Sequence, residues 1–451
     1  MRLPLAVCLI LTGCMGRIGE DTGGPAALPA ANTTMTSAPG GDAPGAIPEA
    51  PPAGAPAPKG EPPPKETPPP PPSEPAPEPT PPLPPKPAPA TQIARLGATF
   101  DIATVGSNKR HADVAFDPIH AVYLVVHGSA PIGGAFIDSD GNAAGAPFAI
   151  SQTPSWAQFP SVTWFPAAGA FLVVWHGSDP GTNTPTPRAR LVAFDKGAVS
   201  FKTPELKVSP AMSYQEVALA VACASPAAEC LVVWTTGAVL TAQRIGVSGA
   251  LLGGAIALAP GSDWNGDCAA SIAPGGSTYV VTHTHADGSG ASLWRRLVQV
   301  GTGAPAGAPL ELGHAAGTWA ALSEWDSVNA RYFTGWWEGS AKSRLLGADG
   351  MPLGASASLV PGYGNYDGLA ISFNASAGVY AVALHGSSEE DFAALIHADG
   401  SSAAPILATA SPAGTHGNFN PRLAAHATRR EWLMVSVRNY ATVVGQRLVA
   451  R

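Results

Sequence analysis

Six aromatic residues along this chain are flanked by polar side chains, and each stands just before a short run of alternating hydrophobic residues. Their rings offer flat apolar faces, and the adjacent amide, hydroxyl and carboxyl groups offer hydrogen bonds, a combination that suits sugars or extended peptides. The six are Trp156, Tyr214, Trp264, Trp319, Tyr366 and Phe419. The alternative interpretation is that each ring packs between neighbouring structural units, as repeated aromatic residues commonly do.

Histidine recurs at a different place, the end of a longer hydrophobic run. Such ends carry either an imidazole or an indole: His127, His176, His283 and His385, or Trp175, Trp234 and Trp336. This alternation is typical of a packing position. Apart from one His-x-His pair, the sequence lacks ligand spacings typical of zinc. We therefore expect neither a metal nor a cofactor.

Two of the five cysteines flank a short turn. Cys223 and Cys230 enclose Ala224-Ser-Pro-Ala-Ala-Glu229, and the ends of such a hairpin can bring two Cβ atoms within disulfide reach. In an oxidising compartment we expect this bond to form and to leave Cys268 unpaired. Its effect would be local stiffening, not catalysis.

Sequence patterns of common enzyme classes are missing. There is no Gly-x-Ser-x-Gly elbow, no phosphate-binding glycine loop, and none of the Ser-x-Asp-x-Gly-x-x-Trp boxes of sialidase-type proteins. The acidic run Glu389-Glu390-Asp391 is the obvious source of carboxylates, and we interpret it as a solvated loop. A non-catalytic protein is the favoured interpretation, although carboxylates from separate units can still meet in the fold.

The elements that position these residues belong to one repeated unit. Its strongest strand starts at Tyr123, Phe171, Cys230, Tyr279, Tyr332, Tyr380 and Trp432, with successive starts 48 to 59 residues apart. A β-rich unit with a period near 50 predicts a propeller or a solenoid.

Four strands can be recognised in the unit. An alternating run such as Ser161–Trp164 precedes the main strand, and a third strand that often carries an arginine follows it (Arg190, Arg244, Arg296, Arg344 and Arg447). A glycine turn such as Asp138–Gly141 then leads to a short fourth strand such as Phe148–Ile150. Four antiparallel strands make one propeller blade. We therefore predict an all-β fold, a seven-bladed β-propeller of four-stranded antiparallel blades; a parallel β-solenoid is the alternative.

The ends of the predicted domain are complementary. The seventh unit stops after its third strand, at Gly445–Arg451, and Leu96–Ile102 looks like a fourth strand without its first three. Joining them closes the ring and removes a long unpaired edge. This closure resembles that of seven-bladed propellers such as WD-repeat proteins. The resemblance covers residues 93–451 and is architectural only, because the Gly-His and Trp-Asp dipeptides of WD repeats are absent at the expected places.

The N-terminus carries a targeting pattern. One positive charge and the apolar run Leu3–Leu11 precede Leu11-Thr-Gly-Cys14, and the run is too short for a stable membrane-spanning helix. The four residues resemble the lipobox of bacterial lipoproteins. That resemblance implies a signal peptide over 1–13, acylation of Cys14 and attachment to a lipid bilayer in the bacterial cell envelope. With Met15 instead of aspartate after the cysteine, it implies the outer membrane. An ordinary signal peptide with an incidental cysteine is the alternative.

Residues 14–92 read as a linker dense in Pro and Ala. Without hydrophobic periodicity it cannot bury enough apolar surface to order itself, so we expect a disordered, semi-stiff spacer. The predicted domains are thus 1–13, 14–92 and a monomeric propeller over 93–451. A net charge of −7 over 451 residues predicts no nucleic-acid partner.

Three functions fit this organisation. The first is an envelope lipoprotein whose propeller serves as a non-catalytic platform for a protein or glycan. The second is a polysaccharide hydrolase or lyase of the envelope, favoured if acidic residues converge at the mouth of the ring. The third is a structural component of an envelope complex, which predicts an exposed apolar patch.

Overall fold

The computed structural model describes residues 90–104, 111–128, 131–152, 157–179, 181–182, 184–209, 218–225, 227–236, 239–260, 267–286, 291–315, 318–360, 368–386, 390–409 and 418–451. All of them belong to one compact unit, Pro81–Arg451. The predicted linker lies almost wholly outside the described residues, so the boundaries at residues 13 and 92 stay predictions. None of the described helices is long and apolar enough to cross a membrane.

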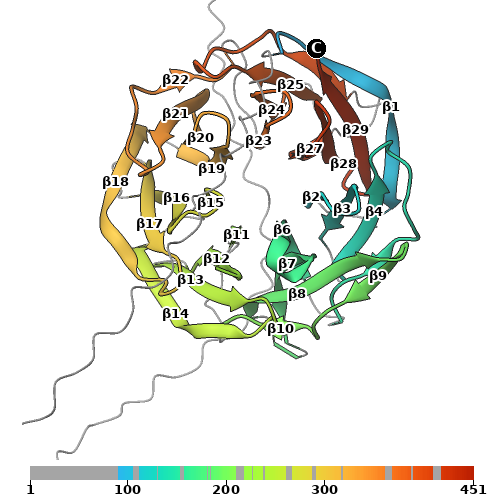
Figure 1. Cartoon of the computed structure of the whole chain (residues 1–451), viewed down its shortest axis with the longest axis vertical. Helices are drawn as coiled ribbons and strands as arrows, with labels where there is room; N and C mark the ends of the chain where they lie inside the picture. Colours follow the sequence, from blue (N-terminus) through green and yellow to red (C-terminus); the bar gives the residue numbers. More distant parts are fainter. Residues whose placement is uncertain are drawn as a thin grey trace, which may run out of the picture. The chain divides into compact units, whose positions relative to one another are not determined.

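Seven antiparallel sheets stand in a ring (Figure 1). The innermost strands are β2 (Ala112–Asp117), β6 (Ala157–Phe165), β11 (Leu219–Ala224), β15 (Cys268–Ile272), β19 (Thr318–Asp326), β23 (Leu369–Asn374) and β27 (Asn418–Ala425). We number the blades 1 to 7 in that order. Each innermost strand contacts those of both neighbouring blades, and β27 contacts β2, so the ring is closed.

The main strand of each repeat is the second strand of its blade, as the sequence predicts. These strands are β3 (Val122–His127), β7 (Ala170–Ser178), β12 (Glu229–Thr235), β16 (Thr278–Ala286), β20 (Arg331–Glu338), β24 (Val379–His385) and β28 (Glu431–Arg438). They are almost entirely buried, which explains why they read as continuous hydrophobic runs. The one 3₁₀ helix among the described residues, η1 (Pro166–Ala168), joins β6 to β7.

The third and fourth strands form the outer half of each blade. The third strands are β4 (Gly133–Asp138), β8 (Pro185–Asp195), β13 (Val239–Gly246), β17 (Ala291–Gln299), β21 (Ala341–Gly347), β25 (Asp391–Ile396) and β29 (Thr442–Ala450). The fourth strands are β5 (Phe148–Ala149), β14 (Leu251–Pro260), β18 (Pro305–Ala315), β22 (Ala357–Ser358), β26 (Ile406–Thr409) and β1 (Ile93–Thr104). In blade 2 two short strands, β9 (Ala198–Phe201) and β10 (Leu206–Lys207), share this place beside β8.

The predicted closure is confirmed. Strand β1 pairs antiparallel with β29, from Ile93 beside Ala450 to Thr104 beside Thr442, and completes blade 7 (Figure 1). The seven-bladed ring is therefore right, and the solenoid alternative is wrong.

The hydrophobic core is divided into seven clusters, one between each pair of neighbouring blades. Aromatic residues at the start of the second strands connect blades across these clusters. Tyr332 accepts a hydrogen bond from the Ala273 N–H of blade 4 at 3.1 Å, and Trp432 donates to the Ser372 carbonyl of blade 6 at 3.1 Å. At Tyr332 and Trp432 the aromatic residue thus combines packing with a hydrogen bond to the preceding blade.

The arginines of the third strands occupy two positions, not the single one that the sequence pattern indicated. Arg190, Arg296 and Arg344 share one register and donate to carbonyls of the fourth-strand segment of their own blade, at 2.7 to 3.2 Å. Arg244 and Arg447 stand one residue further along the strand, and each pairs with a glutamate of its own blade. A shift of one residue along a strand moves a side chain to the opposite face of the sheet, so the two sets of arginines have different partners.

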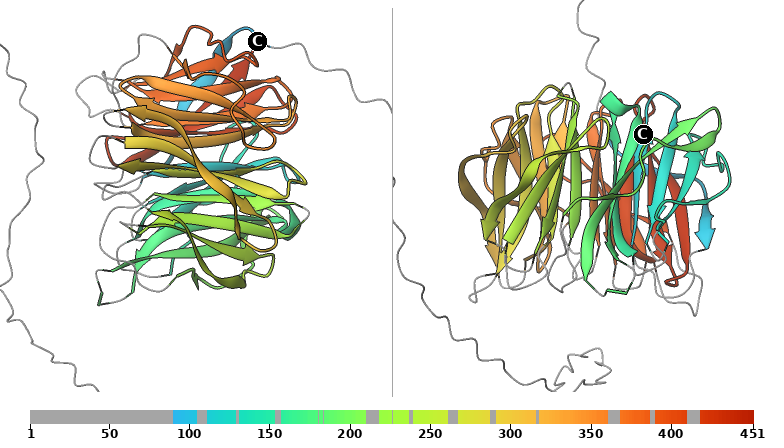
Figure 2. Two further views of the ribbon diagram at one scale, coloured as in Figure 1. Left: turned by 90° about the vertical axis from the view of Figure 1, so that its left-hand side faces the viewer. Right: turned by 90° about the horizontal axis from the view of Figure 1, so that it is seen from below.

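The two faces of the ring differ in their connections (Figure 2). The turns that join first to second strands, and third to fourth strands, lie on one face, which we call the turn face. The opposite face, at which the innermost strands begin, we call the loop face. The turn face exposes Ile119, Val247, Leu251, Met351 and Leu353, spread over blades 1, 3 and 5.

Candidate functional site

The predicted aromatic face lies mostly outside the described residues. Trp156, Tyr214, Trp264 and Tyr366 fall there. Trp319 and Phe419 lie near the starts of β19 and β27, within the strands and not before them, and their side chains are not described. The aromatic face therefore stays a prediction.

Three innermost strands carry a bulge near the loop face. Phe159, Ala320 and Asn420 have φ values of 53°, 53° and 49°, at the register shifts of β6, β19 and β27. A positive φ in a residue other than glycine costs about 1–3 kcal/mol, and bulges re-aim neighbouring side chains. The bulges set blades 2, 5 and 7 apart from the other blades at this end of the ring.

Six charged residues lie on or directly before innermost strands, and two of them, Asp117 and Asp326, are completely buried where β2 and β19 end. We call the other four the axial cluster. They are Asp113, Asp267, Glu324 and Arg422, from blades 1, 4, 5 and 7. None is fully buried, and Asp267 is exposed, so water reaches the strands that surround the ring axis. Sequence reasoning missed all four, because each stands alone in its repeat.

Side chains of the innermost strands cap backbone N–H groups of the next blade. Asp113 accepts from Val162 N–H at 2.9 Å, and Glu324 accepts from Phe373 N–H at 3.3 Å. Ser372 accepts in the same way from the Ala425 N–H of blade 7, at 3.1 Å. An innermost strand has no partner strand on its axial side, so its N–H groups need other acceptors. These three side chains therefore help to hold neighbouring blades together.

The carboxyl groups of the axial cluster bind protons more tightly than usual. Burial raises the pKa of Asp113 and Asp267, and the positive charge of Arg422 partly offsets this for both. Although Asp267 is accessible to water, protein surrounds it on many sides. Burial also raises the pKa of Glu324 to about 7, and the Phe373 N–H only partly opposes the shift.

Glu324 makes stability depend on pH in a defined direction. Its folded-state pKa of about 7 exceeds the ordinary 4.5, so the folded protein holds this proton more tightly than the unfolded chain. Stability is therefore lost as pH rises from about 4.5 to about 7. We expect Glu324→Gln, which keeps an acceptor for Phe373, to raise the free energy of unfolding at pH 8 by roughly 1–3 kcal/mol.

The measurement is chemical denaturation of both proteins at pH 4.5 and pH 8. The two should differ at pH 8 and converge at the lower pH. Asp399→Asn, at an exposed turn, is the control and should show no such dependence. A difference between wild type and Glu324→Gln that is the same at both pH values would contradict the assignment.

Three histidines near the ends of the second strands are buried in the protein interior. His176, His283 and His385 are buried, and Trp175, Trp234 and Trp336 are fully buried. Burial, followed by the charges of His285 and Arg296, lowers the pKa of His283 to about 4, so it is neutral near pH 7. Within the described residues, no three His, Cys, Asp or Glu side chains are grouped so that they could hold a metal ion.

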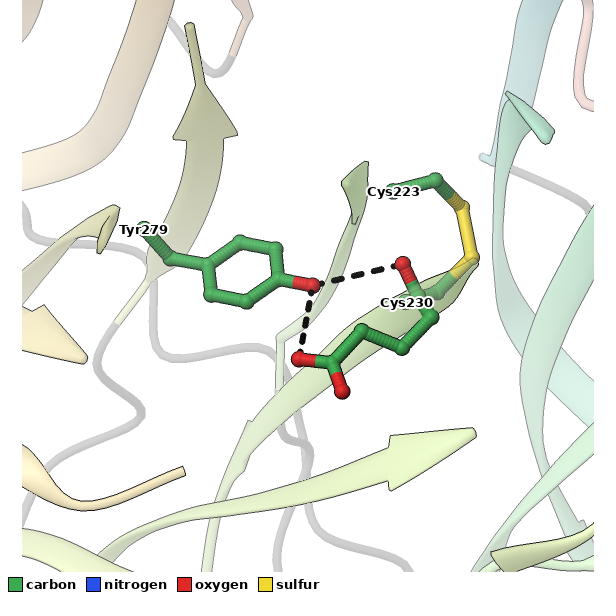
Figure 3. The surroundings of a disulfide bond; sticks show 4 residues. Cys223, Cys230 and Tyr279 are labelled. Atoms are coloured by element: carbon green, nitrogen blue, oxygen red, sulfur yellow. Dashed lines mark hydrogen bonds between the residues drawn. A yellow bond between two sulfur atoms is a disulfide. The ribbon is translucent and has the colours of Figure 1, made fainter. Parts of the chain in front are cut away.

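A disulfide joins Cys223 to Cys230 at the turn-face end of blade 3 (Figure 3). The two residues stand directly opposite each other in the β11–β12 ladder. Next to them Glu229 binds Tyr279 of blade 4, whose hydroxyl donates to its carbonyl at 3.3 Å and to its carboxylate at 3.4 Å. Cys268 is a buried free thiol, and burial raises its pKa, so it has no thiolate character near pH 7.

The interpretation of Glu389–Asp391 as a solvated loop is wrong for its last residue. Asp391 begins β25 and is completely buried. Its carboxylate accepts a hydrogen bond from the Thr409 hydroxyl at 2.7 Å and lies 3.3 Å from Nδ1 of His385. The charge sits inside blade 6, where a hydroxyl and an imidazole partner it.

No family model matches the chain, and no curated protein matches its sequence. Solved structures match the fold. A lectin of Burkholderia pseudomallei, BP39L, is 14% identical with a TM-score of 0.54, over 76% of this chain and 97% of the lectin. The Cps50 (Swd1) β-propeller domain of Myceliophteria thermophila is 9% identical with a TM-score of 0.46, over 77% of this chain and 99% of that domain.

Prolyl oligopeptidase B of Galerina marginata is 10% identical, with a TM-score of 0.44 over 73% of this chain. The match spans about half (47%) of the length of that enzyme. At these identities the likeness is one of fold alone: the described part of the chain is a β-propeller.

Proposed function

We propose that this protein is a lipoprotein of the bacterial cell envelope whose propeller is a non-catalytic binding platform for a protein or glycan. The main observation in support of a non-catalytic platform is that two carboxylates of the axial cluster are engaged in structural hydrogen bonds. Asp113 and Glu324 are engaged with backbone N–H groups of the next blade, so they serve the rigidity of the ring. The proposed ligand-binding surface is the loop face, with its predicted aromatic residues.

The anchoring part of the proposal rests on Leu11-Thr-Gly-Cys14 and the apolar run before it. Two or three acyl chains on Cys14 would hold the protein on a membrane far more firmly than one chain does. We expect Cys14→Ser to lose incorporation of labelled palmitate and to move the protein from the membrane fraction to the soluble fraction. Cys8→Ser is the matched control and should keep both the label and the membrane. Retention of label by Cys14→Ser would overturn the anchor.

The binding part is tested on the aromatic face. Alanine at Trp156, Tyr214, Trp264, Trp319, Tyr366 and Phe419 should abolish binding on a glycan array and to purified envelope proteins. The matched control replaces Ile119, Val247, Met351 and Leu353, exposed on the turn face, by serine and should bind like wild type. If only the turn-face control loses binding, the partner binds at the turn face. That result would favour the third function, a structural component of an envelope complex. Full binding by the aromatic variant would refute the loop-face platform.

A polysaccharide hydrolase or lyase is the second candidate, and one observation favours it. A carboxyl group with a pKa of about 7, such as Glu324, is suited to general acid catalysis near neutral pH. Release of soluble sugar from envelope polysaccharide by wild type, and its loss in Glu324→Gln, would support the enzyme over the platform.

A further inference from the structure

In four blades the turn between the first and second strands is closed by a side chain at one shared position. The position lies directly opposite the first residue of the second strand and is occupied by Asp117, Asp326, Asn374 and His426. In blades 1 and 5 a carboxylate oxygen there accepts from the N–H groups two and three residues later, at 2.7 to 3.3 Å. In blade 6 the amide oxygen accepts from the Ala377 N–H at 3.0 Å. In these three blades a side-chain oxygen therefore caps the turn.

In blade 7 a ring nitrogen takes the place of that oxygen. Nδ1 of His426 accepts from the N–H groups of Thr428 and Arg429, both at 3.1 Å. Backbone N–H groups only donate, so Nδ1 carries no proton and the neutral ring carries its proton on Nε2. Nε2 then donates to the Ser139 hydroxyl of blade 1 at 2.9 Å, and this hydroxyl donates to the Ala121 carbonyl at 2.7 Å. The contacts of both ring nitrogens thus require the neutral form of a nearly buried histidine.

The turn that His426 caps also connects blade 7 to blade 1, across the place where the ring closes. The guanidinium of Arg429 donates to the Ser139 carbonyl at 3.2 Å and to the Asp140 carboxylate at 2.8 Å. We call these two contacts, together with the bond from His426 to Ser139, the seam. Because Nδ1 of His426 holds the backbone N–H of Arg429, the cap orders the residue that bridges the two blades.

We propose that His426 is an acid-sensitive latch, whose protonation releases the turn at residues 426–431 and loosens the seam between blades 7 and 1. A proton on Nδ1 would point at the two N–H groups from which this nitrogen now accepts. Both hydrogen bonds would be lost, and a positive charge would face two donors. The amide of Asn374 takes up no proton, so the equivalent turn of blade 6 lacks this response. The latch goes beyond the proposed binding function, because it makes one seam of the ring responsive to pH.

The groups around His426 come from its own turn and from three neighbouring elements. The charged ones are Arg429, Glu431, Arg447 and Asp140. The rings of Phe116 and Tyr123 of blade 1 pack against the imidazole, with centroids 4.4 and 6.4 Å away. From blade 6 the neutral amide of Asn374 donates to the His426 carbonyl at 3.4 Å.

These surroundings favour the neutral ring. Burial and then the charge of Arg429 lower the pKa of His426, and the nearby carboxylates only partly oppose this. The hydrogen bond from Arg429 lowers the pKa of Asp140, so this carboxylate stays charged where the histidine titrates. The folded protein therefore holds the histidine proton less tightly than the unfolded chain does. The stability that the neutral ring provides is complete above about pH 6.5 and is lost as pH falls through the folded-state pKa.

The test is amide hydrogen exchange of the full-length chain at pH 7.5 and pH 5.0, corrected for the intrinsic pH dependence of exchange. A local measurement is needed because Glu324 changes global stability in the opposite direction as pH falls. We expect protection of the Thr428 and Arg429 N–H groups to be about fivefold lower at pH 5.0. The Ala377 N–H, in the equivalent turn of blade 6, should keep its protection.

His426→Asn copies the cap of blade 6 and should remove the pH dependence, so that protection of the turn is the same at both pH values. His426→Asp, which copies blades 1 and 5, is the second variant, and thermal unfolding at pH 7.5 verifies the fold of each. His397→Asn makes the same substitution at a half-buried turn-face histidine of blade 6 and should respond like wild type. Equal protection of the wild-type turn at both pH values would overturn the latch. So would an undiminished fall of protection in a folded variant at position 426.

Discussion

Deletion of β1, residues 93–104, is expected to abolish cooperative folding of the propeller. The strand supplies the outer edge of blade 7 along nearly the whole of β29, and the buried Ile93 joins the core between blades 6 and 7. Phe100 and Ile102 pack in the cluster between blades 7 and 1. A fully buried side chain of this kind contributes about 1.5–3 kcal/mol, and the half-buried Phe100 and Ile102 each contribute part of that. The sum, together with an unpaired β29, approaches the roughly 5–15 kcal/mol by which a domain is stable.

The measurement is thermal unfolding of the full chain with and without these residues. The deleted protein should aggregate or lose its transition, and a synthetic peptide of residues 93–104 added in trans should restore part of it. A milder companion is Gly445→Val. A Cβ at Gly445 would lie 2.6 Å from Cζ of Phe100, so the variant should lower the melting temperature by displacing one ring from β29. An unchanged transition in the deletion would mean that the closure carries no stability.

The sequence was sufficient to predict this closure, because both ends of the domain lack strands that the other supplies. A period near 50 and the buried second strands also predicted seven blades correctly. These features repeat, so each copy supports the interpretation of the others. The pairing register of the third strands, in contrast, cannot be read from the sequence repeat. Arg190 and Arg244 look equivalent in sequence, yet they differ by one position in the ladder and so lie on opposite faces of the sheet.

The axial cluster was beyond sequence reasoning for a different physical reason. Asp113 and Glu324 accept hydrogen bonds from residues about 50 positions later in the chain, in another blade, and nothing in the local sequence marks them. Asp391 is the reverse case, a residue for which the local sequence suggested the wrong environment. Its neighbours in sequence are acidic, so local composition predicted exposure, whereas Thr409 and His385 surround it in the fold. Tertiary partners decide the burial of a single charge.

Breaking the ion pair of Glu229 with Arg244 should destabilise the propeller strongly. Glu229 is buried, and its carboxylate accepts from Nη2 of Arg244 at 2.7 Å, from Gly301 N–H at 2.9 Å and from the Tyr279 hydroxyl. Burial, followed by the nearby Glu229, raises the pKa of Tyr279, so this hydroxyl stays protonated and donates. Glu229→Ala leaves a largely buried guanidinium without its partner. We expect a loss of about 3–5 kcal/mol in the free energy of unfolding.

Blade 7 contains the matched control. Glu431 pairs with Arg447 at 2.8 Å in the same register, but both side chains are more exposed, and Arg447 also donates to the Asp140 carbonyl at 2.9 Å. We expect Glu431→Ala to cost only about 1–2 kcal/mol, because Arg447 keeps a partner and water. Adding Arg244→Met to Glu229→Ala should recover part of the larger loss, since the uncompensated charge is gone. If Glu229→Ala and Glu431→Ala lower the free energy of unfolding equally, the prediction is wrong. Burial of Glu229 and its hydrogen bonds to blade 4 would then add nothing to the stability that the ion pair provides.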